Sequence, residues 1–304
     1  MKPLHLKTIS EFHKLHFLLP PDHPLISVVD YAKVAAAKKE VLPQPIVSDY
    51  YSISVKRGLS GKMRYGQQEY DFDEGVMYFM APGQVLHPGP QNDERAKPSG
   101  WILLIHPDFL WNTALAKNIR RYGYFDYAVH EALFLSDKEE TIINSIVQNI
   151  QGEARTNIDT FTQGIIISQL ETMFHYAERF YQRQFITRKI SSHKILDRLE
   201  QFLSDYFNDE SIMEKGLPTV QNIADALNTS PSYLSGLLKT LTGQNTQQHI
   251  HNKLIEKAKE KLSTTDLSVS EIAYELGFEH PQSFNKLFKA KTSLSPLAFR
   301  QSFN

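Results

Sequence analysis

Two stretches of the sequence decide the fold: IADALNTSPSYLSGLLKTLTG at residues 223–243 and IAYELGFEHPQSFNKLFKAKTS at residues 272–293. They are two copies of one pattern, since matched residues lie 49 positions apart before a central turn and 50 positions apart after it. The offset changes because the second turn is one residue longer; beyond it, Leu234 matches Phe284. Such a repeat indicates that one structural unit occurs twice.

Each copy is predicted to form a helix, a tight turn and a second helix. Asn228 and Gly277 stand where the first helix must stop, and Asn and Gly tolerate the left-handed backbone conformation found there. Pro231 and Pro281 suit the first turn of the next helix, where a missing N–H costs nothing. The second helices carry apolar faces at i, i+3 and i+4: Leu234, Leu237 and Leu238, and Phe284, Leu287 and Phe288. This is the helix-turn-helix arrangement, whose second helix can lie in the major groove of DNA.

One copy alone would be ambiguous, because short helical hairpins also occur as ordinary core elements, but two copies favour DNA binding. We place the motifs at about residues 220–241 and 269–291. Between them, residues 246–262 have apolar residues at helical spacing and predict a linker helix of about 25 Å. That length suits two recognition helices on one face of DNA, one turn (~34 Å) apart.

Residues of about 195–304 strongly resemble the two-motif DNA-binding domain of AraC/XylS-type bacterial transcription regulators. The resemblance rests on AYELGFEHPQSFNKLFKAKTSLSPLAFR and, upstream, on TSPSYLSGLLKTLTG. It implies that a small-molecule-binding or dimerising barrel precedes the two motifs. The sequence departs from the pattern at Ser293, where Gly is usual, at Gly236, where a long polar or basic side chain is common, and at Lys253, where Arg is common. Gly236 predicts fewer base contacts from the first recognition helix.

The residues expected to contact DNA lie on the faces of the two second helices that point away from their apolar sides. Gln and Asn can pair with adenine and Lys with guanine, so these residue types can read sequence. Other cations are expected on phosphates, which fix register without reading sequence. The expected base-reading set is Ser232, Tyr233, Ser235, Gln282, Ser283, Asn285 and Lys286, and the expected phosphate set is Lys239, Lys289, Lys291 and Arg300.

Overall charge gives no sign of nucleic-acid binding, since 33 Lys and Arg stand against 34 Asp and Glu. Residues 1–193 hold 21 cationic and 21 anionic side chains, and residues 194–304 hold 12 and 13. Binding must therefore come from the local placement of a few cations and of helix N-termini. We expect one chain to bind DNA weakly and a homodimer to supply the rest.

The first half is predicted to be rich in β-structure. Between residues 48 and 79, short runs of aromatic and β-branched residues alternate with glycine-containing turns, and WILLIH at residues 101–106 reads as a buried strand. This spacing favours an antiparallel barrel or sandwich. From residue 107 the pattern is helical, and residues 159–185 carry an apolar face wide enough to pack on the barrel and also to form a homodimer.

The predicted fold class is α+β in two domains. Residues 1–188 are expected to form a cupin-like β-barrel followed by helices, for effector binding and dimerisation. Residues 189–304 are expected to form an all-α DNA-binding domain with two helix-turn-helix motifs and a linker helix. The basic segment at residues 183–194 is the predicted linker between the domains.

YDFDEGVMYFMAPGQVLHPG at residues 70–89 resembles a strand pair of cupin-type barrels. A metal-binding cupin needs a cluster of His and Glu ligands, and no His occurs between His23 and His87, so we expect no metal and no cofactor. Each aromatic residue here could be ordinary core, and the ligand could be a sugar, a lipid, an aromatic acid or none. The candidate effector-pocket residues are Tyr50, Tyr51, Arg64, Tyr65, Tyr78, His87 and Trp101.

These features predict a dimeric, effector-responsive, sequence-specific DNA-binding transcription regulator, activator or repressor, and no enzyme. The alternatives are a cupin-type metal-dependent enzyme with an accessory helical domain, and a protein that binds partners through its helices. The absence of cysteine excludes thiol chemistry. Expected partners are double-stranded DNA, a second copy of the chain, a small-molecule effector and RNA polymerase. No apolar run approaches the ~18 residues of a membrane span, and no secretory signal is recognised, so a cytoplasmic protein is expected.

Overall fold

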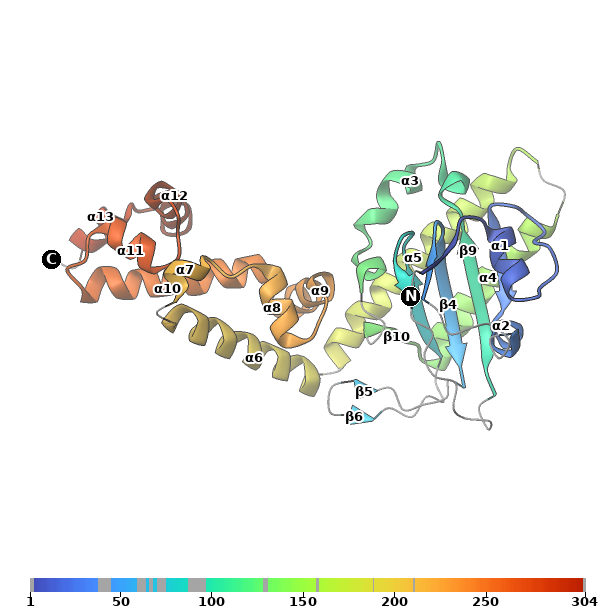
Figure 1. Ribbon diagram of the computed structural model, residues 1–304, viewed down its shortest axis with the longest axis horizontal. Coiled ribbons are helices and arrows are strands. Elements are labelled where there is room, and N and C mark those ends of the chain that lie inside the picture. The colour runs from blue at the N-terminus through green and yellow to red at the C-terminus, as the bar shows by residue number, and fades with distance from the viewer. Residues whose placement is uncertain are drawn as a thin grey trace. The chain divides into compact units, whose positions relative to one another are not determined.

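The computed structural model divides into two compact units, Met1–Gln184 and Phe185–Asn304. It describes residues 3–37, 45–58, 64–65, 68–69, 75–86, 97–127, 131–156, 159–187, 189–209 and 211–302. The first unit mixes strands with helices, whereas the described part of the second unit contains helices and their connections (Figure 1). The predicted α+β class is confirmed.

A five-stranded sheet with the order β10-β7-β4-β9-β2 organises the first unit. Its strands, all paired antiparallel, are β2 (Ile26–Asp30), β4 (Tyr51–Arg57), β7 (Val76–Met80), β9 (Ser99–Ile105) and β10 (Leu133–Phe134). A smaller sheet contains β1 (Leu4–Leu6), β3 (Ile46–Ser48) and β8 (Val85–Leu86), and a hairpin contains β5 (Arg64–Tyr65) and β6 (Gln68–Glu69). Among the described strands no ladder joins these sheets, so the closed barrel suggested by the sequence is not seen there.

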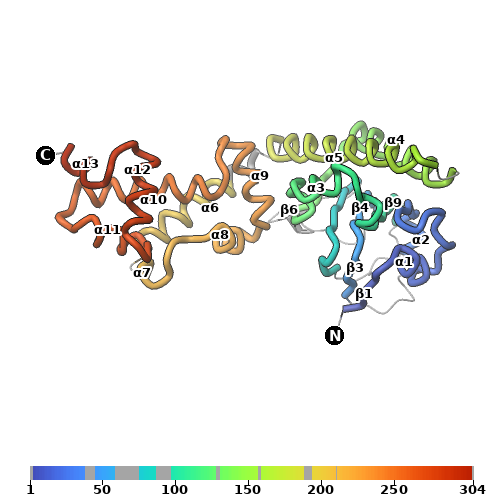
Figure 2. The backbone as a smooth tube through the Cα atoms, turned by 90° about the horizontal axis from the view of Figure 1, so that it is seen from above, coloured from blue at the N-terminus to red at the C-terminus, as the bar shows by residue number. Residues whose placement is uncertain are grey.

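Both faces of the five-stranded sheet are covered by helices (Figure 2). Val29, Ile102 and Leu104 point to one face, where they share a buried cluster with α1 (Ile9–Leu15) and α2 (Tyr31–Ala37). Because successive side chains of a strand alternate between faces, Trp101 points to the opposite face. That face carries α4 (Asp137–Arg155), and α5 (Thr162–Thr187) follows it in the chain.

Short helical segments connect β9 to α4. They are η1 (Pro107–Leu110), α3 (Ala114–Asn118), η2 (Ile119–Arg121) and η3 (Gly123–Asp126). Their aromatic residues complete the core between the sheet and α5. Tyr124 lies 4.4 Å from Phe79 of β7 and 5.7 Å from Tyr181 of α5, measured between ring centroids.

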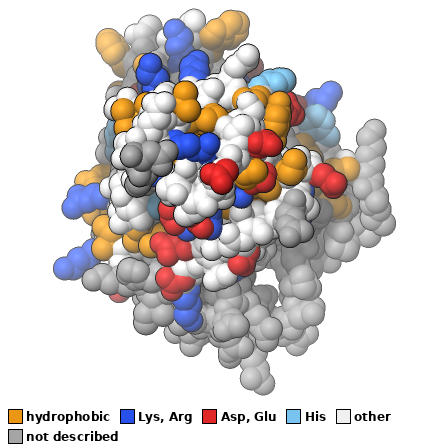
Figure 3. All heavy atoms as spheres, turned by 90° about the vertical axis from the view of Figure 1, so that its left-hand side faces the viewer, with side chains coloured by type: hydrophobic (Ala, Val, Ile, Leu, Met, Phe, Trp, Pro, Cys, Tyr) orange, Lys and Arg blue, Asp and Glu red, His pale blue; other side chains and the backbone are white. Residues whose placement is uncertain are grey.

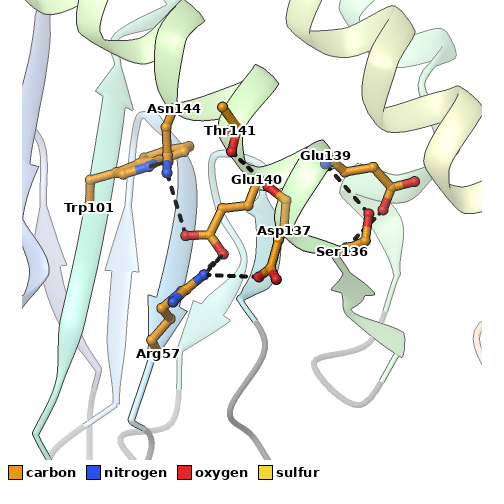
Figure 4. A network of polar contacts seen from close by, with 8 residues as sticks. All are labelled: Arg57, Trp101, Ser136, Asp137, Glu139, Glu140, Thr141 and Asn144. Atoms are coloured by element: carbon orange, nitrogen blue, oxygen red, sulfur yellow. Dashed lines mark hydrogen bonds and ion pairs between the residues drawn. The ribbon is translucent and has the colours of Figure 1, made fainter.

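A polar network attaches α4 to the sheet (Figure 4). Arg57 at the end of β4 donates two hydrogen bonds to one carboxylate oxygen of Glu140, at 3.0 Å from Nε and 2.7 Å from Nη2. One turn further along α4, Asn144 accepts a hydrogen bond of 2.8 Å from the indole N–H of Trp101. Gly75 leaves room for this carboxylate, because a Cβ at that position would collide with it.

Within the predicted linker at residues 183–194, the residues on both sides of residue 188 are helical. Helix α5 continues to Thr187, and α6 (Lys189–Asn208) begins two residues later. Arg183 donates to Glu139 and, at 2.7 Å, to the carbonyl of Phe134 in β10. These contacts hold the last turns of α5 on the first unit, which the run of basic residues did not reveal.

The second unit consists of two helix-turn-helix motifs on either side of one long helix. The first motif is α8 (Val220–Leu227) and α9 (Pro231–Thr242), and the second is α11 (Val269–Glu275) and α12 (Pro281–Thr292). The remaining helices are α6, α7 (Ile212–Lys215), α10 (Thr246–Thr264) and α13 (Pro296–Gln301). A single buried apolar cluster runs from α6 through both motifs and includes Leu254, Ala258 and Leu262 of α10.

The turns of the two motifs have the backbone conformations that the sequence predicts. Asn228 ends α8 with a φ of 56°, and Gly277 follows α11 with a φ of 83°. A Cβ on Gly277 would lie 2.9 Å from the carbonyl carbon of Gly216, so α7 packs against this turn at a distance that only glycine allows. Ser293 ends α12 in the left-handed region with a φ of 64°, where Gly243 ends α9 with a φ of 74°.

Replacing Ser293 with Gly should raise the free energy of unfolding, and replacing Gly243 with Ser should lower it. The left-handed conformation costs a non-glycine residue roughly 1 kcal/mol, and nothing lies within 4 Å of a Cβ at Gly243, so the backbone alone decides. Urea unfolding of both variants beside the wild type measures the two changes. Equal stability of all three proteins would contradict the assignment of Ser293 as a strained helix end.

Candidate nucleic-acid interface

Helix α12 presents a polar face from a helix whose opposite side is fixed in the core. Phe284 and Phe288 are fully buried, with ring centroids 5.7 Å apart. Their burial turns the other side of the helix outward. Five residues predicted to contact DNA are exposed there: Gln282, Ser283, Asn285, Lys286 and Lys289.

The second helix of each motif carries lysine and no carboxylate, although the chain as a whole is nearly neutral. α12 carries Lys286, Lys289 and Lys291 and no carboxylate, and the one charged residue of α9 is Lys239. Among the described residues, no carboxylate forms an ion pair with any of these four lysines. Elsewhere carboxylates and lysines pair with one another, as Lys261 and Glu275 do at 2.7 Å. Seen from the left-hand side of Figure 1, the surface shows basic, acidic and apolar side chains next to one another (Figure 3).

The histidines of α10 do not add to this positive charge at neutral pH. Burial lowers the pKa of His249 and of His251, and nearby Lys291 lowers the pKa of His251 further. Both rings are therefore neutral at pH 7, where they form hydrogen bonds. His249 pairs with the hydroxyl of Thr242 at 2.9 Å, and His251 pairs with the side chain of Gln247 at 2.9 Å.

The predicted contact residues of α9 do not all lie on its surface. Tyr233 is 3% exposed, and its ring meets that of Phe185 edge-on at 5.1 Å, so its side chain packs inside the unit rather than on its surface. Ser235 is half-buried, and its hydroxyl lies 3.1 Å from the hydroxyl of Thr246, which is fully buried. Ser232 is half-buried as well, whereas Lys239 is exposed. Helical spacing alone did not reveal these neighbours because they come from other elements.

Arg300 also differs from its predicted role as a phosphate contact. Its side chain turns inward, and Nε donates a hydrogen bond of 3.1 Å to the carbonyl of Leu262 near the end of α10. It therefore satisfies an otherwise free carbonyl of the last turn of that helix. Lys291, which is also a predicted phosphate contact, is exposed.

A hollow of about 460 Å³ continues the exposed face of α12 toward α13. Asn285, Lys286 and Lys289 form one wall, and Pro296 and Leu297 at the start of α13 form another. Leu297 is 56% exposed and gives this wall an apolar surface. The sequence pattern does not reveal this hollow, because it depends on how α13 folds back beside α12.

The predicted effector residues of the first unit do not form one set. Tyr51 and Trp101 lie on the sheet face that carries α4, whereas Tyr78, paired with Ser54, points to the opposite face. The side chains of Arg64 and Tyr65 lie outside the described residues, and so does His87. Trp101 lines a hollow of about 560 Å³ together with Arg57, Glu140 and Asn144, and burial raises the pKa of Tyr78. Tyr50 is buried in the cluster with α1 and α2.

Within the described ranges, three or more His, Asp or Glu side chains do not come together in a way that could hold a metal ion. None of the described helices combines the length and the apolar character that crossing a bilayer requires.

Sequence comparison places the two motifs among known domains. Residues 223–302 match the family model described as a helix-turn-helix domain. The transcriptional activator RhaS of Enterobacter sp. is 34% identical over 35% of this chain and 36% of its own length. The arabinose operon regulatory protein of Escherichia coli is 23% identical over 85% of this chain and 83% of its own length. The regulator YfiF of Bacillus subtilis is 26% identical over 54% of this chain, which spans 49% of YfiF.

Two bacterial proteins of known structure show similarity to this chain. The carboxyl-terminal domain of the response regulator AraT of Geobacillus stearothermophilus is 30% identical over 36% of this chain and 84% of that domain, with a TM-score of 0.32. Apo ToxT of Vibrio cholerae is 15% identical over 92% of this chain and 97% of that chain, with a TM-score of 0.31. The relatives named here are transcriptional regulators and not enzymes, in agreement with the prediction that the chain is no enzyme.

Replacing Ser235 with Ala should lower the free energy of unfolding by about 1 kcal/mol, because the buried hydroxyl of Thr246 loses its partner. The matched control is Ser283 of α12, which is exposed and whose replacement with Ala should change stability by less than about 0.5 kcal/mol. Thermal or urea unfolding compares the two variants. Equal effects would contradict the structural role of Ser235.

Proposed function

We infer that this chain, whose residues 223–302 are an AraC-type helix-turn-helix domain, is a sequence-specific DNA-binding transcription regulator. The observation that carries the inference is the outer face of α12. It brings together amides, a hydroxyl and lysines without a carboxylate, on a helix fixed from behind by two buried phenylalanines. Amides and lysines are the groups that pair with base edges in the major groove.

The two motifs are proposed to contact one duplex on the same face. Their shared buried cluster and the 19-residue helix α10 support this, because they hold α9 and α12 in a fixed relation. At 1.5 Å per residue α10 is about 28 Å long, which is comparable to the ~34 Å of one turn of DNA. The exposed Lys239, Lys289 and Lys291 would neutralise phosphates.

The first unit is proposed to sense a small molecule, on a cupin-like scaffold. Its antiparallel sheet and the hollow of about 560 Å³ beside Trp101 support this role, since ligand pockets measure roughly 300–1,000 Å³. An effector would alter regulation by binding one geometry of the protein more tightly than another. The regulator would act in the cytoplasm, on transcription by RNA polymerase.

Homodimerisation is proposed to occur through α5 and the residues just before it. Phe161 is 71% exposed and Ile165 is 46% exposed, although both are large and apolar. The next turns present the small side chains of Ser168 and Thr172, which allow another helix to approach closely. Pairing two chains would double the number of phosphate contacts, which compensates for the few cations on each.

Replacing Lys289, an exposed phosphate candidate, with Ala should weaken duplex binding and flatten its salt dependence. Each phosphate contact contributes about 0.9 to the slope of log K against log salt concentration, so the slope should fall by about that amount. Fluorescence anisotropy on a labelled duplex at several salt concentrations measures it. The control is Lys215→Ala, which also removes one positive charge. Lys215 ends α7 and pairs with Asp209 at 2.7 Å. An equal change of slope in both variants, or no binding by the wild type, would contradict the proposal.

Replacing Ile165 with Glu should raise the dissociation constant of the dimer about thirtyfold, because interface hot spots are worth about 2 kcal/mol or more. Sedimentation velocity across a concentration series measures the shift. The control is Gln182→Glu. Gln182 is exposed on the same helix, so this variant adds the same negative charge outside the proposed interface. An unchanged dimer in the Ile165→Glu variant would exclude this face as the interface.

A further inference from the structure

We propose that the two recognition helices contribute unequally to sequence specificity. Helix α12 contacts the bases, whereas α9 positions the protein in its groove and makes few base contacts. The DNA site would then consist of one strongly specified half-site and one weakly specified half-site. This proposal rests on the proposed DNA-binding function and assigns specificity within it. It follows from comparing the two helices position by position, at the repeat offset of 50 residues.

The first matched pair is Asn285 and Ser235. Asn285 is exposed, and no hydrogen bond of its side chain is seen among the described residues, so its amide is available to a base. A carboxamide can donate to N7 and accept from N6–H of adenine at once. The Ser235 hydroxyl is already engaged with Thr246 at 3.1 Å and is half-buried. The same position therefore offers a reading group in α12 and an internal packing contact in α9.

The second matched pair is Lys286 and Gly236. Lys286 is exposed on α12 and is unpaired among the described carboxylates, so its ammonium can donate to guanine. Gly236 has no side chain with which to reach a base. A glycine inside a helix also costs helix stability relative to alanine. Its presence on this face therefore fits a close approach of the α9 backbone to the groove.

The remaining pairs show the same division. Gln282 of α12 is exposed and long, whereas Ser232 at the matched position is short and half-buried. Ser283 is exposed, whereas Tyr233 at the matched position is 3% exposed. Only the pair Lys289 and Lys239 is alike, since both lysines are exposed. A lysine near the end of each helix would contact phosphate, so both helices anchor the protein while one of them reads sequence.

The test is selection of bound sequences from a random duplex pool, using the full chain. The wild type should enrich one half-site with strong preferences, containing A·T and G·C pairs, beside a half-site with weak preferences. Asn285→Ala should erase the preference at one base position and weaken binding to the selected site about 5- to 140-fold, the factors that correspond to 1–3 kcal/mol at 1.4 kcal/mol per tenfold. Gln201→Ala, which also removes one exposed carboxamide but lies on α6 outside both motifs, is the control and should leave the selected sequence and the affinity unchanged.

A gain-of-function variant gives an independent readout. Gly236→Lys should place a cation on the reading face of α9, raise affinity for random duplex and steepen the salt slope by about 0.9. Two half-sites of equal strength, or a selected motif that Asn285→Ala leaves intact, would overturn the unequal division while leaving DNA binding in place. Failure of the wild type to enrich any sequence would instead overturn the proposed function, and the division of labour with it. Circular dichroism checks that each exposed substitution leaves the fold intact.

Discussion

The second unit depends on one continuous apolar core built around α10. Leu254, Ala258 and Leu262 are buried within it, and the same cluster includes Leu234 of α9 and Phe284 of α12. Because packed cores resist small displacements, the two motifs are held as parts of one body rather than as separate hairpins. A protein that contacts two successive stretches of a duplex needs this rigidity, since the spacing of DNA grooves is fixed by the helix of the DNA itself.

The same core decides which side chains remain for recognition. Burial of Phe284 and Phe288 forces the polar side of α12 outward, and Lys286 and Lys289 emerge there without a neighbouring carboxylate among the described residues. Electrostatic attraction to DNA is thus a local property of one helix and does not require a basic domain. In the first unit, the Arg57–Glu140 pair and the contacts of Arg183 show the opposite use of charge, because there it attaches helices to a sheet.

The internal repeat was sufficient to predict both motifs, their turns at Asn228 and Gly277, and the face of α12. These features depend on local conformation and helical spacing, which a single sequence contains. The sequence did not predict the internal contacts of Tyr233, Ser235 and Arg300, because each involves a residue from another element, namely Phe185, Thr246 and Leu262. In the first unit, Tyr78 and Trp101 were both predicted to line an effector pocket. The strand register, which cannot be read from the sequence, places them on opposite faces of the sheet.

Hydroxyl-radical footprinting of the full chain on a selected duplex tests the central claim most directly. If one rigid core presents α9 and α12 to the same side of DNA, the backbone should be protected in two patches per chain, on one face and about 10 base pairs apart. Protection confined to a single patch per chain, or two patches on opposite faces of the duplex, would contradict the account.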